Sequence, residues 1–150
     1  MAPIHIEDLK AGDEIPTLEV EVGPVQMFYY SAAAYNGHRI HYDSGWTERD
    51  EGYPGLLVQG HLQAALLARA VTDWIGGAGR LVKFATQNRG AAFVGATLRF
   101  RGSVVAVRSA EGLVDLELAG ESADGRQLMP GTATVALPSE TKGVDSGAEG

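Results

Sequence analysis

The pattern of hydrophobic and polar positions divides the chain into an early part with helices and a later part with strands. Residues 17–22, TLEVEV, alternate polar and apolar side chains, as a strand with one buried face does. Residues 25–35, VQMFYYSAAAY, follow Pro24 without a helix-breaking residue and predict a helix. Residues 56–75 predict a second helix, and positions 62–71 within it are apolar on almost every side. We expect this second helix to be buried in the core.

Four segments with the character of strands follow the second helix. Glycines in residues 76–79, GGAG, end that helix because glycine readily adopts the left-handed conformation of a helix end. Asp124 and Gly125 form a dipeptide that is typical of hairpin turns. The four segments span residues 80–89, 97–108, 112–122 and 127–137. Helices that precede a run of antiparallel strands indicate an α+β fold class.

The polar stretch 35–43, YNGHRIHYD, lies between the two predicted helices. It holds two of the four histidines of the chain. The surrounding residues 36–55 are rich in Gly, Asp, Asn, Ser and Thr, so we expect a loop here. Two interpretations stay open on the residues alone. Asn36 and His41 either form and cap turns, or they belong to a functional site.

Length and composition fit a single globular domain. A chain of 150 residues supports one hydrophobic core, and its 45% hydrophobic and 21% charged residues are ordinary for a folded protein. We expect this domain over residues 1–137 and a disordered tail over residues 138–150, where almost no side chain is apolar. The chain has no cysteine, which excludes disulfides, thiolate catalysis and cysteine metal sites.

Charge and hydropathy exclude several classes of partner. The net charge of -7 argues against a nucleic-acid partner. The first residues are charged and lack the apolar centre of a signal peptide. The apolar run at 62–71 contains Gln63 and Arg69 and is shorter than the roughly 20 residues that span a bilayer. We therefore expect a cytoplasmic protein that has no membrane partner.

Residues 28–62 resemble the motif region of MaoC-like acyl-thioester hydratases and dehydratases. The phrases HRIHYD, EGYPGL and VQG carry the resemblance, and they are most similar to the branch of hydroxyacyl-thioester dehydratase and mesaconyl-C4-CoA hydratase. Residues 89–102, RGAAFVGATLRFRG, are similar to a later strand pair of the family. The resemblance implies a hot-dog fold, in which an antiparallel sheet wraps around a central helix.

The resemblance also implies an activity, the reversible hydration of a 2-enoyl thioester, with Asn36, His41 and Gly60 as the catalytic residues. The thioester is carried by coenzyme A or acyl carrier protein, and no metal or other cofactor is expected. An imidazole titrates near neutral pH, so His41 suits a group that takes a proton from water and returns it to carbon. Asn36 would hold the water. The Gly60 N–H, at the positive end of a helix, would stabilise the thioester oxygen, although this glycine equally suits close helix packing.

The family pattern further suggests substrate contacts and shows two departures. The candidate contact residues are Tyr53, Gly55, Leu56, Val58 and Arg89. Asn36 stands where the family commonly has Asp, and Gln59 stands where His is frequent. With Asn36 unable to accept a proton, the resemblance implies a mechanism with His41 as the single base.

Four other polar residues of this region, His38, Arg39, Asp43 and His61, are assigned no catalytic role. For Asp43 two alternatives stay open. It either orients His41 or caps a short helix at residues 44–50.

Two other functions remain compatible with the sequence. A non-catalytic hot-dog subunit that supports an active partner also accounts for the missing carboxylate, and a thioesterase is less favoured because such enzymes generally use a carboxylate. A single hot-dog unit leaves sheet edges unpaired, so we expect a homodimer, with a heteromer of two hot-dog chains as the alternative.

Overall fold

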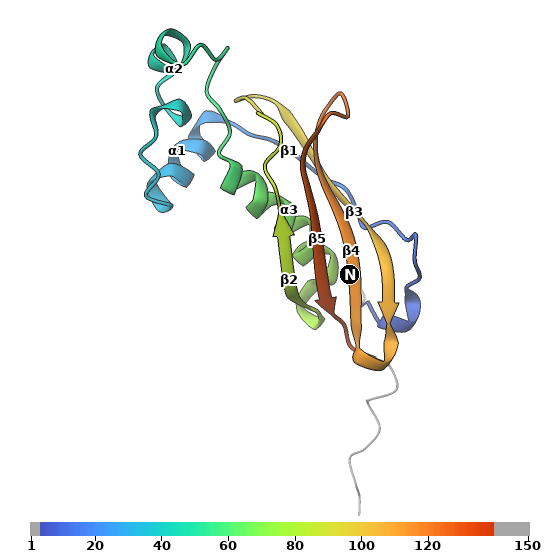
Figure 1. Cartoon of the computed structure of the whole chain (residues 1–150). Coiled ribbons are helices and arrows are strands. Elements are labelled where there is room, and N and C mark those ends of the chain that lie inside the picture. Colours follow the sequence, from blue (N-terminus) through green and yellow to red (C-terminus); the bar gives the residue numbers. More distant parts are fainter. Residues whose placement is uncertain (1–3, 140–150) are drawn as a thin grey trace, which may run out of the picture.

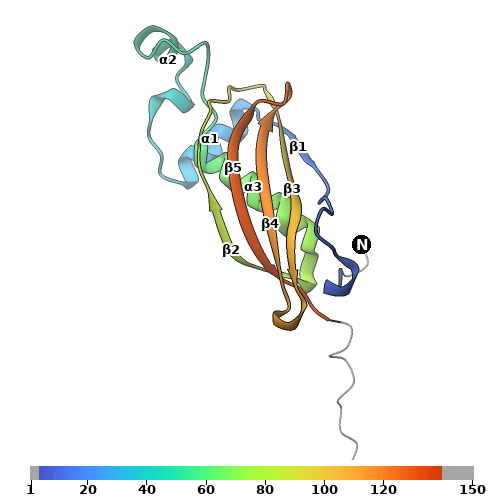
Figure 2. The same cartoon turned by 45° about the vertical axis from the view of Figure 1, so that its right-hand side comes forward.

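Five strands form one antiparallel sheet around a long helix. The computed structural model describes residues 4–139. Its helices and strands are β1 (Leu18–Glu21), α1 (Pro24–Ala33), α2 (Ser44–Asp50), α3 (Gly60–Ile75), β2 (Arg80–Thr86), β3 (Thr97–Arg108), β4 (Leu113–Ser122) and β5 (Gln127–Ala136). The strand order is β1-β3-β4-β5-β2, which leaves β1 and β2 at the edges. Figures 1 and 2 show the sheet curling around α3, the arrangement that the resemblance in the sequence implies.

The core lies between α3 and the concave face of the sheet. Leu67 and Val71 of α3 are fully buried, and so are Val114 and Val135 of the facing strands. Each such side chain contributes on the order of 1.5–3 kcal/mol by leaving water. The prediction of a buried central helix is confirmed, because the apolar residues of α3 supply its contact with the sheet.

The second helix begins later than the sequence pattern predicts. Residues 56–58 are extended rather than helical: Leu57 forms a bridge with Phe93, and the Val58 N–H donates to the Ala92 carbonyl at 2.9 Å. The helix starts only at Gly60. A short apolar run such as LLV fits a buried strand and a buried helix equally well, so periodicity alone does not locate this boundary.

The predicted strands agree closely with those observed. The bounds of β3 are those predicted, and β4 and β5 differ from their predicted ranges by one residue at one end. Strand β2 ends at Thr86 rather than residue 89. Beyond it the chain still pairs irregularly, since the Gln87 N–H donates to Pro130 at 3.1 Å and the Arg89 N–H donates to Leu128 at 2.8 Å.

The segment between α1 and α3, residues 34–59, projects beyond one end of the sheet (Figures 1 and 2). It contains the short 3₁₀ turn η2 (Arg39–His41) and helix α2. The Asp43 Oδ1 accepts the Trp46 N–H at 2.9 Å and so caps α2. Of the two alternatives for Asp43, the helix cap is therefore the one observed. This projecting segment carries the whole polar stretch 35–43.

The end of the chain is described only in part. The Pro138 carbonyl accepts the Ile6 N–H at 3.1 Å, which ties the residue after the last strand to the 3₁₀ turn η1 (Ile6–Asp8). Residues 140–150, which make up most of the predicted disordered tail, lie outside the described residues. Among residues 4–139, no helix has the length and apolar character needed to cross a membrane.

Candidate active site

His41 is a buried side chain held in one orientation by a backbone carbonyl. The residue is the last of η2, and only 8% of it is exposed. The Nδ1 atom lies 2.8 Å from the Leu57 carbonyl oxygen, and the Leu57 N–H in turn donates to Ile40 at 2.9 Å. A carbonyl oxygen only accepts, so Nδ1 carries the proton in this bond. In the neutral ring the lone pair is consequently on Nε2, which is the form a base requires.

The surroundings of His41 favour its neutral form. Burial, the largest effect, lowers the pKa of His41 below its ordinary value of 6.5. The hydrogen bond to Leu57 opposes this shift, and positive charge on His38 adds to it, with the two rings 6.1 Å apart between centroids. The imidazole is therefore uncharged at neutral pH and ready to accept a proton.

Asn36 is positioned by the end of helix α1. The Asn36 N–H donates to the Ser31 carbonyl at 2.8 Å, and the Tyr35 N–H donates to Ala32 at 3.3 Å. These two bonds form a Schellman motif, in which the residue before the last donor adopts the left-handed conformation. That residue is Tyr35, with φ of 52°. Glycine is usual at this position, so the chain adopts a strained conformation directly before Asn36.

Asn36 and His41 are connected through the backbone of His38. The Asn36 Oδ1 accepts the His38 N–H at 3.2 Å, and the His38 carbonyl accepts the His41 N–H at 3.2 Å. Within the part of the chain that the structure describes, the two side chains share no hydrogen bond. The Asn36 amide nitrogen has no partner there either, so it remains available to a ligand.

Gly60 is the first residue of α3, and its N–H has no hydrogen-bond partner among residues 4–139. A Cβ atom at Gly60 would lie 2.9 Å from the Asn88 Nδ2. A side chain here would therefore displace Asn88. The close packing that the sequence suggested for this glycine agrees with this geometry.

Gln59 and Ser31 form a buried polar contact that the sequence did not reveal. Gln59 is fully buried, and its Nε2 donates to the Met27 carbonyl at 2.7 Å and to the Ser31 Oγ at 2.9 Å. The Gln59 Oε1 is buried without a partner in the described structure. This contact joins the start of α3 to α1 across 28 residues of sequence. The signal in the sequence was Gln59 itself, a polar residue at a position where the family frequently has His.

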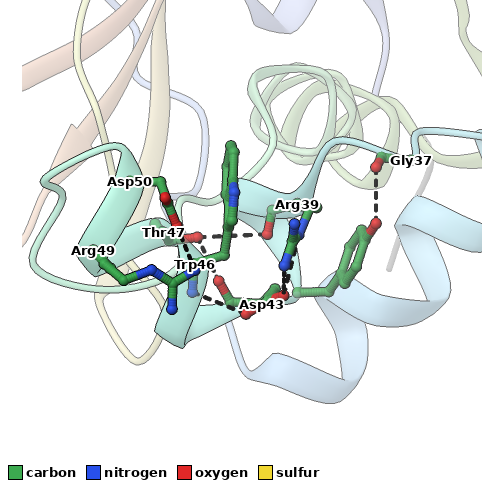
Figure 3. Close-up of polar contacts among 8 residues, drawn as sticks. Gly37, Arg39, Asp43, Trp46, Thr47, Arg49 and Asp50 are labelled. Atoms are coloured by element: carbon green, nitrogen blue, oxygen red, sulfur yellow. Dashed lines mark hydrogen bonds and ion pairs between the residues drawn. The ribbon is translucent and has the colours of Figure 1, made fainter.

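Arg39, the first residue of the turn η2, contacts Asp43 and Trp46 (Figure 3). The Arg39 Nη2 lies 2.7 Å from the Asp43 Oδ2, and the guanidinium carbon lies 5.0 Å from the centre of the Trp46 ring. The hydrogen bonds from the Arg39 side chain and the Trp46 N–H lower the pKa of Asp43, which keeps its carboxyl group ionised. Asp43 is thus committed to these partners and makes no bond to His41.

The predicted substrate contacts lie on several parts of the fold, and Leu56 and Val58 flank Leu57, whose carbonyl holds His41. Tyr53 lies beside Phe93, with ring centroids 6.4 Å apart, and Val58 is buried in the core. Leu56 lines a hollow against α1, and its carbonyl accepts the Val94 N–H at 2.9 Å. Gly55 directly precedes Leu56 and is half-buried. Arg89 follows β2, where its side chain donates to Gln87.

A pocket of about 480 Å³ opens beside Asn36. Its volume lies in the range of about 300–1,000 Å³ that is usual for small-molecule sites. The lining residues, which come from α1 and from the start of the projecting segment, are Phe28, Ser31, Ala32, Tyr35, Asn36, Gly37 and Tyr42. Residues 4–139 contain no cluster of three or more side chains suited to hold a metal ion.

Comparison with known proteins places this chain in a family of thioester dehydratases. The sequence model of hydroxyacyl-thioester dehydratase type 2 matches residues 5–93. Mesaconyl-C(4)-CoA hydratase of Chloroflexus aurantiacus is 46% identical over 66 residues, which are 44% of this chain and 23% of the relative. The matched region thus spans about a quarter of that relative's length.

Solved structures show the same fold at low sequence identity. The (R)-hydratase from A. caviae, described as involved in PHA biosynthesis, is 20% identical with a TM-score of 0.81, over 88% of this chain and 99% of that one. A chain of the ChsH1-ChsH2 complex from Mycobacterium tuberculosis is 21% identical with a TM-score of 0.76, over 86% and 98%. The expected hot-dog fold is thereby confirmed, and the chain belongs to the hydroxyacyl-thioester dehydratase type 2 family of MaoC-like proteins.

Proposed function

We propose that the protein is a hydro-lyase that adds water reversibly to a 2-enoyl thioester, with coenzyme A as the favoured carrier. The observation that carries this proposal is the orientation of His41. Its Nδ1 is bound to Leu57, and its buried ring is neutral at neutral pH, which leaves Nε2 as a base. A turn-forming histidine on a solvated loop has no need of either feature.

The proposed reaction uses His41 twice. Its Nε2 takes a proton from water while the water oxygen bonds to Cβ of the enoyl group. The electrons of the double bond then move to Cα and the thioester oxygen. The resulting imidazolium returns the proton to Cα, so the net change is the addition of one water molecule. No electron transfer occurs, and the proposal therefore includes no redox cofactor.

Asn36 and Gly60 take supporting roles in this proposal. Among residues 4–139, the Asn36 Oδ1 accepts a hydrogen bond only from the His38 N–H, which leaves a lone pair for the attacking water. The free Gly60 N–H, at the N-terminus of α3, is a donor for the oxygen that gains negative charge. Gly60 lies three residues after Leu57, whose carbonyl oxygen holds His41.

The direct test is turnover of enoyl thioesters by the purified chain. A panel of 2-enoyl-CoA compounds with short, long, branched, dicarboxylic and steroid-like acyl groups is followed by loss of the conjugated absorbance. We expect hydration of at least one compound. Folded protein that turns over none of them, and none of the corresponding acyl carrier protein thioesters, would contradict the proposal.

A second candidate is a non-catalytic subunit that supports a different hot-dog chain. Asn36 in place of a carboxylate favours it, and so does the structural likeness to a complex of two named chains. The buried and oriented His41 favours the enzyme. A thioesterase remains the least supported, because Asp43, the carboxylate nearest in sequence to His41, is committed to Arg39 and to the cap of α2.

A further inference from the structure

The contact between Gln59 and Ser31 makes the Ser31 hydroxyl oxygen a hydrogen-bond acceptor. Both hydrogens of the Gln59 Nε2 are used, one by the Met27 carbonyl and one by the Ser31 Oγ. The Ser31 oxygen is therefore an acceptor in this contact, and its own proton must go elsewhere. The structure gives that proton no acceptor among residues 4–139. Ser31 is only 7% exposed, so little water reaches it.

Ser31 is part of the wall of the pocket beside Asn36, where the other lining groups are mostly aromatic or small. The Tyr42 hydroxyl is already committed, since it donates to the Gly37 carbonyl at 2.9 Å. Tyr35 projects from its strained position and is 98% exposed. Ser31 is thus a buried donor without a partner at the edge of an apolar space. A ligand that fills this space meets that donor.

No charged side chain lines this pocket. A carboxylate bound there would lose much of its hydration without gaining a cation, which is unfavourable. An uncharged oxygen that accepts a hydrogen bond, such as a keto or hydroxyl oxygen, matches both the buried Ser31 donor and the neutral surroundings. A purely aliphatic chain would leave the Ser31 donor unpaired.

We propose that this pocket receives the acyl group of the thioester and that Ser31 donates to an uncharged oxygen carried by that group. This inference rests on the proposed function, because it takes Asn36 as the boundary between the pocket and the reacting carbons. The substrate class is then a 2-enoyl thioester whose acyl group bears a keto or hydroxyl oxygen. Loss of one such hydrogen bond changes binding by about 10-fold to 100-fold.

The test compares short 2-enoyl-CoA compounds of equal chain length that end in a methyl, keto, hydroxyl or carboxylate group. For the unmodified protein we expect kcat/KM for the keto or hydroxyl compound to exceed that for the methyl compound by about 10-fold or more. In Ser31→Ala this ratio falls toward one. Ser31→Cys, which keeps a side chain of similar shape with a weak donor, gives an intermediate ratio and guards against misfolding of the alanine variant.

Ser103→Ala is the matched control, because Ser103 lies on β3 outside this pocket. We expect it to keep the ratio of the unmodified protein. A higher kcat/KM for the methyl or carboxylate compound, or a ratio that survives Ser31→Ala, overturns the inference and leaves the hydratase proposal intact. Absence of turnover with every compound overturns both.

Discussion

At the scale of single residues, the proposed function makes His41 the group that sets the pH range of activity. Burial lowers the pKa of His41, and the proposed reaction needs its uncharged form in both directions. Activity is therefore present above that pKa and is lost as the pH falls through it. We expect kcat/KM to decline on the acidic side with a midpoint below 6.5, measured as a pH profile with buffers of constant ionic strength.

His38 provides a direct check of this assignment. Its positive charge lowers the pKa of His41, so His38→Gln removes one of the causes of the shift. The acidic limb of the profile should then move to higher pH. A limb that stays in place in His38→Gln and persists in His41→Ala would show that another group controls the profile.

Asn36 gives a second prediction at this scale. Asn36→Ala removes the Oδ1 that accepts the His38 N–H and, in the proposal, the group that holds the water. We expect a loss of turnover that the loss of stability seen in thermal melting does not account for. Asn36→Asp keeps the acceptor and adds a titrating group beside the water, so it should retain activity with a changed pH profile. An alanine variant as active as the unmodified protein would remove Asn36 from the mechanism.

At the scale of elements, the end of α1 combines strain with a functional position. Tyr35 adopts φ of 52°, where a residue with a side chain is unfavourable by about 1 kcal/mol or more. Tyr35→Gly should therefore raise the free energy of unfolding by up to about 1 kcal/mol in denaturant titration. Tyr29→Gly, at an exposed and ordinary position inside α1, should lower it by a similar amount. Equal effects of the two variants would contradict the strain at Tyr35.

The sequence predicted most elements because their signals are local. The sequence pattern predicted both ends of β3 correctly. The apolar surface of α3 predicted the place of this helix in the core. The predicted start of α3 was wrong because the pairing of Leu57 with Phe93 decides where the helix begins. That pairing joins residues far apart in the chain. The contact of Gln59 with Ser31 escaped prediction for the same reason.

The candidate site was predicted more from the resemblance to a known family than from the pattern of residues along the chain. The motif named Asn36, His41 and Gly60, and the structure describes the geometry that makes their roles testable. The motif did not indicate that Asn36 follows a strained Tyr35 or that Ser31 lies buried at the pocket. Spacing along the chain carries no information on such contacts, which depend on how α1 and α3 pack.

At the scale of the whole molecule, the surface of one chain predicts association. Within the described part of the chain, strands β1 and β2 have no neighbour at their outer edges, and Val82 on β2 is 45% exposed. Helix α1 also exposes Val25, Phe28 and Tyr29. Such edges and apolar surfaces are usually covered in stable proteins. Light scattering at micromolar concentration should give twice the mass of the 15.8-kDa chain. A monomer that dimerises only with another hot-dog chain would favour the support-subunit alternative.

The central claim is that His41 is the single acid-base group of a thioester hydratase, and its removal is the sharpest test. With the best substrate of the panel, His41→Ala should lower turnover by about 10²-fold to 10⁴-fold, the usual contribution of a positioned acid-base group. Circular dichroism and melting establish that the variant is folded, and His5→Ala, at the N-terminal end of the chain, should keep normal turnover. Turnover of folded His41→Ala within a few fold of the unmodified protein would contradict the account.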